Sequence, residues 1–226
     1  MAFWLTIIHG LRPISPLRHG MDLALAAWLF PPICVICRRR AIHPWLDLCD
    51  ACLQILPLQP LAQAGTPLIA ALGYAFPADH WVRRLKFNSD RVAGRLLGTL
   101  LAGSVLAAGD RLPDALVPVP LHPRRLAERG YNQSLLIARQ CALLLDRPVR
   151  PHWLRRVTHS PAQTRLAARE RLHNVAGAFA AAGSVRGKTL ALVDDVHTTG
   201  ATASACTQAL LGAGAASVRT WTACRS

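Results

Sequence analysis

Two adjacent carboxylates and a group of hydroxyl residues occur together near the carboxyl end of the chain, in the segment L-A-L-V-D-D-V-H-T-T-G-A-T (190–202). The apolar run 190–193 is typical of a parallel strand that is covered on both faces. This pattern places Asp194 and Asp195 at the carboxyl end of a strand, which is the edge at which open α/β sheets bind ligands.

The residues that follow the acids are suited to holding a phosphate. They offer backbone N–H groups, hydroxyls and the start of a helix, and they are Thr198, Thr199, Gly200, Ala201 and Thr202. The alternative is an ordinary strand-turn-helix in which one Asp caps the helix and the threonines form a turn. Because that alternative explains neither the second acid nor the glycine, we expect a site for a phosphorylated sugar. His197 is assigned no role.

A second segment, V-P-V-P-L-H-P-R-R-L-A-E-R-G-Y-N-Q-S (117–134), is predicted to leave a strand and to return as a helix near Asn132. The guanidinium groups of Arg124, Arg125 and Arg129 and the backbone at Gly130 can converge there on one anion, for which pyrophosphate is suitable. Arg129 is the preferred pyrophosphate contact. The alternative is a solvated basic loop.

Four of the seven cysteines form two C-x-x-C pairs, Cys34 with Cys37 and Cys49 with Cys52. This spacing predicts a closed structural Zn²⁺ site, in which the metal stabilises a small module and does not catalyse. A disulfide or redox role would need an oxidising compartment or a thioredoxin-like context, and neither is evident. His43 could substitute as a ligand, but with four thiols available it is expected to be a surface residue. Cys141 and Cys206 lie on helical patterns and are expected to be buried structural cysteines, whereas Cys224 is close to the end of the chain; none of the three has a nearby base that would make it a nucleophile.

Composition limits the class of protein. With 226 residues, of which 52% are hydrophobic, the chain can bury a substantial core and is not expected to be disordered. A formal charge of +14 favours anionic partners: phosphorylated substrates, nucleic acid or an acidic protein surface. No apolar run has the length of a membrane span, and the amino end lacks the features of a secretory signal.

The order of the predicted elements indicates an α/β fold with a mostly parallel sheet flanked by helices. We expect strands at 68–76, 115–119, 190–193 and 217–222, and helices at 79–87, 90–107, 132–145 and 201–211, the last closed by Gly212. Residues 56–67 are expected to be a linker. The predicted parts are an extension (1–31) with a helix at 22–29, a zinc ribbon (32–60) and the main domain (66–226). That helix is expected to pack on the main domain; the alternative is a helix that binds a membrane surface or a partner.

Residues 190–202 resemble, at every position, the phosphoribosyl pyrophosphate (PRPP) motif of type I phosphoribosyltransferases. The resemblance implies that Asp194 and Asp195 hold the ribose 2′- and 3′-hydroxyls, and that residues 198–202 cradle the 5′-phosphate. Mg²⁺ is then expected to bridge pyrophosphate and ribose oxygens near the two acids, since this ion is commonly held by one or two carboxylates and by phosphate oxygens.

From about residue 32 to 223 the chain resembles the ComF family, also called competence protein F or amidophosphoribosyltransferase-like proteins. The likeness is carried by the four cysteines, P-V-P-L (118–121), R-G-Y-N-Q (129–133), Gln163 with Arg171 and Asn174, G-A-F (177–179) and D-D-V-H-T-T-G-A-T (194–202). It implies a type I phosphoribosyltransferase fold preceded by a zinc ribbon. It also implies a place in the bacterial cytoplasm and, in some members, a link to uptake of transforming DNA.

In type I enzymes a mobile loop often covers the site, and residues 158–174 are the candidate here. Closure would bring Gln163, Arg165, Arg171 and Asn174 onto the leaving group; the alternative is an exposed charged helix. Lys86, in L-K-F, matches a lysine of the family pattern.

Two functions follow. The first is a phosphoribosyltransferase that uses Mg²⁺ and releases pyrophosphate, with Asp194, Asp195 and Arg129 as its catalytic residues. The second is a non-catalytic PRPP- or DNA-binding accessory protein of the competence machinery, with single-stranded DNA and a competence helicase as partners.

Overall fold

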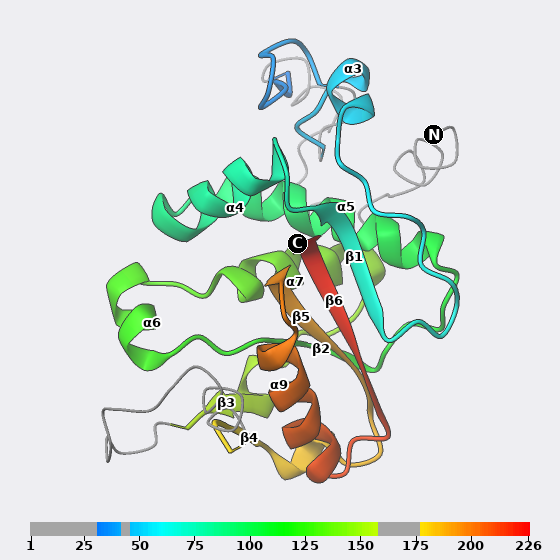
Figure 1. Cartoon of the computed structure of the whole chain (residues 1–226), viewed down its shortest axis with the longest axis vertical. Coiled ribbons are helices and arrows are strands. Elements are labelled where there is room, and N and C mark those ends of the chain that lie inside the picture. Colours follow the sequence, from blue (N-terminus) through cyan, green and yellow to red (C-terminus); the bar gives the residue numbers. More distant parts are fainter. Residues whose placement is uncertain (1–30, 42–45, 158–176) are drawn as a thin grey trace, which may run out of the picture.

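The computed structural model describes residues 31–41, 46–157 and 177–226 (Figure 1). Its centre is a parallel four-stranded sheet of order β1-β6-β5-β2. These strands are β1 (Leu68–Gly73), β2 (Ala115–Pro118), β5 (Thr189–His197) and β6 (Ser217–Arg225). A small antiparallel pair, β3 (Leu154–Arg156) and β4 (Phe179–Ala181), forms a second sheet. The predicted α/β class with a parallel sheet is confirmed.

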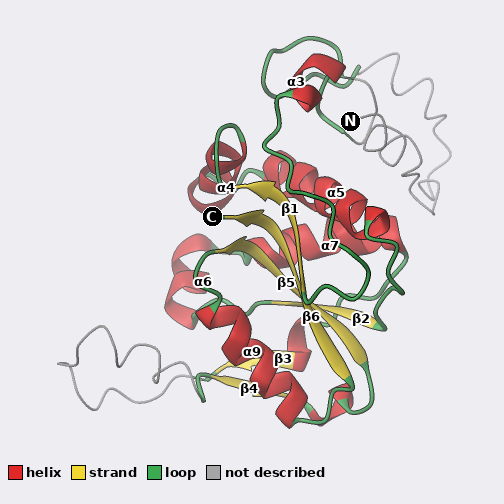
Figure 2. Cartoon of the chain, turned by 45° about the vertical axis from the view of Figure 1, so that its right-hand side comes forward, coloured by secondary structure: helices red, strands yellow, loops and turns green. Residues whose placement is uncertain are grey.

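Helices cover both faces of the main sheet (Figure 2). On one face lie α5 (Arg91–Ala107) and α7 (Gln133–Leu145), with α4 (Ala78–Phe87) packed beside α5. On the other face lies α9 (Ala201–Gly212), which also contacts β4. The short helices are α3 (Asp50–Gln54) and α6 (Pro123–Arg129). Within the described ranges, every helix is too short or too polar to span a bilayer.

Strand β5 is buried on both faces, as its apolar run predicted. Ala191 and Val193 belong to the core beneath α5 and α7, whereas Leu190 and Leu192 belong to the core beneath α9. The alternation follows from the period of two of a strand. It fixes β5 in the middle of the molecule, between β2 and β6, so that its carboxyl end opens at the centre of one edge of the sheet.

Side-chain caps fix the starts of α5 and α7. Asp90 Oδ1 accepts from the N–H groups of Val92 and Ala93 at 3.0 and 3.1 Å. Asn132 Oδ1 accepts from Leu135 N–H at 3.3 Å, while Asn132 Nδ2 donates to the Val119 carbonyl at 2.9 Å. The second contact ties the start of α7 to the segment that follows β2, and so places α7 beside the carboxyl edge of the sheet.

Several elements differ from the expectations. Residues 123–129 form α6 where a loop was expected, and β3 and β4 were not predicted. Strand β5 continues to His197, so that both acids lie within the strand and not after it. Gly212 is the last residue of α9, and the turn is made by Gly214, with φ +95. In the expected linker, Leu58 forms an antiparallel bridge to Leu72 along the edge of β1.

Some expectations fall outside the described residues. They are the helix at 22–29, His43, and the loop 158–174 with Gln163, Arg165, Arg171 and Asn174.

Candidate functional site

A cleft of about 500 Å³ lies at the carboxyl edge of the parallel sheet. Helices α4 and α6 and the C-terminus lie at the same edge (Figure 2). All four main strands contribute to its wall. Tyr74 follows β1, residues 119–121 follow β2, residues 194–196 lie in the last part of β5 and Ser226 follows β6. The cleft is therefore at the edge where the sequence placed a ligand site.

The paired acids have different partners. Asp194 Oδ1 accepts from Ser134 Oγ at 3.1 Å and from the Asp195 N–H at 2.9 Å. Asp195 Oδ2 lies 2.9 Å from Lys86 Nζ, and this ion pair is largely withdrawn from water, with 8% of the Asp195 side chain and 26% of the Lys86 side chain exposed. The structure thus gives Lys86 a contact that the sequence did not indicate.

Burial and the neighbouring Asp195 charge raise the pKa of Asp194 to about 8. Asp194 therefore holds its proton through most of the neutral range when no ligand is present. A cation or a pair of hydroxyl donors placed beside it would favour its ionised form, since both interact better with a carboxylate than with a carboxylic acid.

The turn after β5 has unpaired backbone donors. Gly200, with φ +77, is the N-cap of α9, and Ala201 N–H donates to Thr199 Oγ1 at 3.5 Å. In the described part of the chain, no protein group accepts from the N–H groups of Thr198, Thr199, Gly200 and Thr202. Thr198 and Thr202 line the cleft, whereas Thr199, Gly200 and Ala201 do not. This is the arrangement of an anion site at a helix N-terminus.

His197 supports the same turn. A Cβ built on Gly200 would lie 3.0 Å from two ring atoms of His197, so the imidazole occupies the space that a larger residue would need. No role could be assigned to His197 from the sequence, because this contact depends on the left-handed backbone at Gly200.

Basic side chains lie around the acids. Lys86, Arg125, Arg129 and Arg156 line the cleft, and the Arg129 guanidinium lies 5.6 Å from the centre of the Phe87 ring. Helix α6 presents Arg125 and Arg129 one turn apart, whereas Arg124 and Gly130 are not among the lining residues. Of the arginines that the sequence singled out in this segment, the structure places Arg125 and Arg129 at the cleft.

Sequence reasoning missed several lining residues, among them the polar side chains of Tyr74, Gln133, Ser134 and Arg156. Gln133 and Ser134 stand in the segment R-G-Y-N-Q-S, which could have drawn attention to them, but the contact of Ser134 with Asp194 depends on how α7 packs on β5. Gln133 Oε1 is buried and has no partner among the described residues. Arg156 ends β3, a strand that carried no signal in the sequence.

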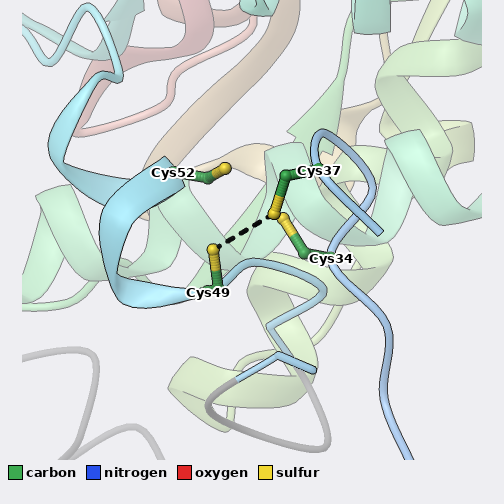
Figure 3. Close-up of side chains that lie close together, drawn as sticks. All are labelled: Cys34, Cys37, Cys49 and Cys52. Atoms are coloured by element: carbon green, nitrogen blue, oxygen red, sulfur yellow. Dashed lines mark hydrogen bonds between the residues drawn. The ribbon is translucent and has the colours of Figure 1, made fainter. Parts of the chain in front are cut away.

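The four N-terminal cysteines come together as predicted (Figure 3). Their sulfur atoms all lie within 4.8 Å of one another, and Cys37 Sγ is 3.5 Å from Cys49 Sγ. Two segments supply them, a tight turn with Cys34 and Cys37 and the start of α3 with Cys49 and Cys52. The cluster is consistent with a tetrahedral zinc site. Cys141 and Cys206 are buried, as expected, and Cys224 is buried as well.

The part of the chain that carries these four cysteines, residues 31–41 and 46–56, packs directly on the helices of the main sheet, and we call it the cysteine segment. Its buried leucines, Leu46, Leu48, Leu53 and Leu56, belong to the same core as the inner faces of α4 and α5. Asp47 also accepts two hydrogen bonds from Arg95 Nη2, at 2.6 and 2.8 Å. The segment and α5 therefore share both apolar contacts and an ion pair.

No family model matches the chain. It is 36% identical over 218 residues to DNA utilization protein YhgH of Salmonella typhimurium, covering 91% of this chain and 94% of the relative. It is 34% identical over 155 residues to competence protein F of Haemophilus influenzae, covering 66% and 68%. A solved structure of glutamine PRPP amidotransferase from B. subtilis, with 22% identity, aligns with 56% of this chain and 25% of that chain at a TM-score of 0.40, too low to support a conclusion. On the first two matches, the chain belongs to the ComF family, together with DNA utilization protein YhgH and competence protein F.

Proposed function

We propose that this protein binds PRPP with Mg²⁺ in the cleft at the carboxyl edge and transfers its phosphoribosyl group with release of pyrophosphate. One observation carries the proposal: the acids Asp194 and Asp195 and the unpaired N–H groups of the turn before α9 adjoin one cleft that arginines also line. PRPP presents hydroxyls, a 5′-phosphate and a pyrophosphate in one molecule, and each has a complementary group here.

Each part of the ligand is assigned to residues of the cleft. Asp194 and Asp195 accept from the ribose hydroxyls, and the turn 198–202 donates to the 5′-phosphate. Arg125, Arg129 and Lys86 face the pyrophosphate. Mg²⁺, when bound with PRPP, would be held by the two carboxylates and by substrate oxygens and would offset the charge of the leaving group.

The chemistry needs little from the protein beyond position and charge. The bond from the anomeric carbon to the pyrophosphate oxygen breaks, its electron pair leaves with pyrophosphate, and a lone pair of the acceptor forms the new bond on the opposite face. The guanidinium groups of Arg125 and Arg129 stabilise the negative charge that develops on the leaving oxygen. The acids hold the ribose while its ring becomes positive.

Lys86 must serve two charges in turn. In the free protein its ammonium pairs with Asp195 at 2.9 Å, which offsets the cost of burying that carboxylate. When hydroxyls and a cation satisfy Asp195, the ammonium becomes available to the pyrophosphate. Lys86 thus keeps the empty site stable and supports the loaded one.

The proposal is tested by calorimetric titration of the full chain with PRPP and Mg²⁺, alongside assays of pyrophosphate release with a panel of bases and amines. We expect the double substitution Asp194→Asn with Asp195→Asn to weaken PRPP binding by about 100-fold or more, because it removes two charged acceptors. Asp146→Asn, the same type of substitution at one exposed residue, is the control and should bind PRPP like the wild type. Unchanged PRPP affinity in the double variant would refute the proposal.

A second candidate function is a non-catalytic accessory protein that binds PRPP or single-stranded DNA. Two observations favour it: the formal charge of +14, and the names of the relatives, which refer to DNA utilization and to competence. PRPP binding without pyrophosphate release for any acceptor would favour this candidate over the enzyme. Binding of a single-stranded oligonucleotide that does not weaken with added salt would count against a phosphate-backbone contact.

We also propose that Cys34, Cys37, Cys49 and Cys52 hold one Zn²⁺. Four thiolates fill a tetrahedral shell and leave no open position for water or substrate, so the ion would be structural. Support comes from the donor chemistry and from the convergence of the four sulfur atoms.

A further inference from the structure

A second hollow, of about 650 Å³, lies between α5 and α7 and is reached past the end of α6. Four arginines line it, and none of its lining residues is acidic: Arg91 and Arg95 come from α5, Arg139 from α7 and Arg129 from the last turn of α6. We call it the α5–α7 pocket. Asp194, Asp195 and the turn 198–202 are not among its lining residues.

The lining of the α5–α7 pocket is apolar as well as basic. Leu136, Leu143 and the ring of Tyr131 contribute to it. The Tyr131 hydroxyl donates to the Leu85 carbonyl, which fixes the ring where α4 ends. Apolar surface beside several guanidinium groups suits a ligand that has both a flat apolar part and a charged part.

Most of the positive charge in the α5–α7 pocket is not balanced by protein. Arg95 pairs with the buried Asp47 at 2.6 Å. Arg91, Arg129 and Arg139 have no carboxylate partner within the described part of the chain, and Arg129 has only the Phe87 ring. Guanidinium groups that face one hollow repel each other, and a bound anion relieves that repulsion while it accepts their hydrogen bonds.

We propose that the α5–α7 pocket is a second anion site that takes a nucleoside monophosphate, with the phosphate on the arginines and the base against Leu136, Leu143 and Tyr131. The volume lies in the range of small-molecule sites, about 300–1,000 Å³. Arg129 lines both this pocket and the cleft at the sheet edge, so an occupant here contacts a residue that also faces the other site. The proposal does not depend on whether the cleft binds PRPP.

The test is calorimetric titration of the full chain with AMP, in the wild type and in the double variant Arg91→Ala with Arg139→Ala. Neither residue lines the cleft at the sheet edge, and both are exposed, so the fold and PRPP binding should be unchanged. We expect AMP binding to weaken about tenfold or more, because two charge-assisted contacts are lost. The control Arg147→Ala, just after the C-terminal end of α7, removes an exposed positive charge that does not line the pocket and should leave AMP affinity unchanged.

Two further measurements test whether positive charge is needed for binding and whether the ligand is a nucleotide or a nucleic-acid strand. Arg139→Glu should weaken AMP binding more than Arg139→Ala, which a general packing defect would not produce; equal effects of the two would refute the proposal. Failure of AMP to bind the wild type, or an equal loss in Arg147→Ala, would also refute it. Binding of a single-stranded oligonucleotide but not of AMP would overturn the nucleotide site in favour of a nucleic-acid track.

Discussion

At the level of single residues, Asp194 is withdrawn from water and lies beside the charge of Asp195, and these effects raise its pKa to about 8. An unfolded Asp has its ordinary pKa of 3.8, so between these two pKa values the folded chain binds more protons than the unfolded one. Stability contributed by this group therefore falls as pH rises through that window.

Asp194→Asn should accordingly gain stability relative to the wild type as pH increases from about 5 to about 8. The amide oxygen can still accept from Ser134 Oγ and from the backbone N–H of Asp195. Urea unfolding of both proteins at the two pH values measures the difference in unfolding free energy. A difference that stays constant with pH would contradict a raised pKa.

The same proton should affect ligand binding. If Mg²⁺ and PRPP require an ionised Asp194, binding at about pH 7 must release a proton, and affinity should rise with pH until about pH 8 to 9 and then level off. Titrations in buffers of different ionisation enthalpy measure the proton count. Binding of PRPP with no proton release at about pH 7 would contradict a protonated Asp194 in the free chain that ionises in the complex.

Lys86→Met leaves the buried carboxylate of Asp195 without its cation. We expect a loss of about 1–3 kcal/mol in unfolding free energy, less than for a fully buried pair because Lys86 is 26% exposed. Adding Asp195→Asn should recover part of this loss, which a double-mutant cycle would measure. Lys188→Met, at an exposed residue that has no ion pair with the residues that the structure describes, is the control and should change stability little.

At the level of elements, α5 and α7 approach closely because α5 carries glycine at their contact. A Cβ on Gly98 would lie 2.7 Å from both Gln140 Cβ and the Ile137 carbonyl oxygen, whereas one on Gly94 would meet Leu85 and Leu136 atoms at 3.3 and 3.4 Å. The first position has no room for a methyl group, and the second nearly accommodates one.

Gly98→Ala should therefore lower the unfolding free energy by about 1–3 kcal/mol, since overpacking outweighs the better helix propensity of alanine. Gly94→Ala is the matched variant and should be near neutral, because its gain in propensity offsets a mild contact. Thermal unfolding of both compares them directly. Equal effects would contradict the close packing of α5 against α7 at Gly98.

The long elements could be predicted from sequence because their signals are local. Asn132 marked the start of α7, and the apolar run marked β5 as a strand that is covered on both faces. Helix α6 was missed because its segment is rich in proline and read as a loop, although Pro123 occupies the first turn and His122 Nδ1 accepts from the Arg124 N–H. Strands β3 and β4 have three residues each, too few to show a period.

The candidate site divides in the same way. Asp194, Asp195 and residues 198–202 lie in one continuous segment, so their proximity followed from the chain itself. Lys86 and Ser134 reach the acids from α4 and α7, and Arg156 reaches the cleft from β3. Those contacts arise from packing between elements that are far apart in sequence, and a single sequence carries no signal for them.

At the level of the whole molecule, the cysteine segment and the main sheet domain share one core, through Leu46, Leu48, Leu53 and Leu56. Because the proposed Zn²⁺ would hold Cys49 and Cys52, which lie between these leucines in the sequence, its loss should affect the entire fold. We expect about one zinc per chain by elemental analysis, and chelation should lower the midpoint of a single cooperative thermal transition.

A matched pair of variants controls for the loss of buried thiols. Cys49→Ser removes a proposed ligand and should reproduce the effect of chelation, whereas Cys141→Ser, at a buried cysteine outside the cluster, should leave the zinc content unchanged. A fully chelated wild type that unfolds at the same temperature as the untreated protein would contradict a structural role for the metal.

The most direct measurement for the central claim is a crystal structure of the full chain with PRPP and Mg²⁺. We expect the ribose hydroxyls to lie within hydrogen-bonding distance of the carboxylates of Asp194 and Asp195, and the 5′-phosphate to lie against the N–H groups of residues 198–202. PRPP bound elsewhere, in the α5–α7 pocket for example, or absent at a saturating concentration, would contradict it.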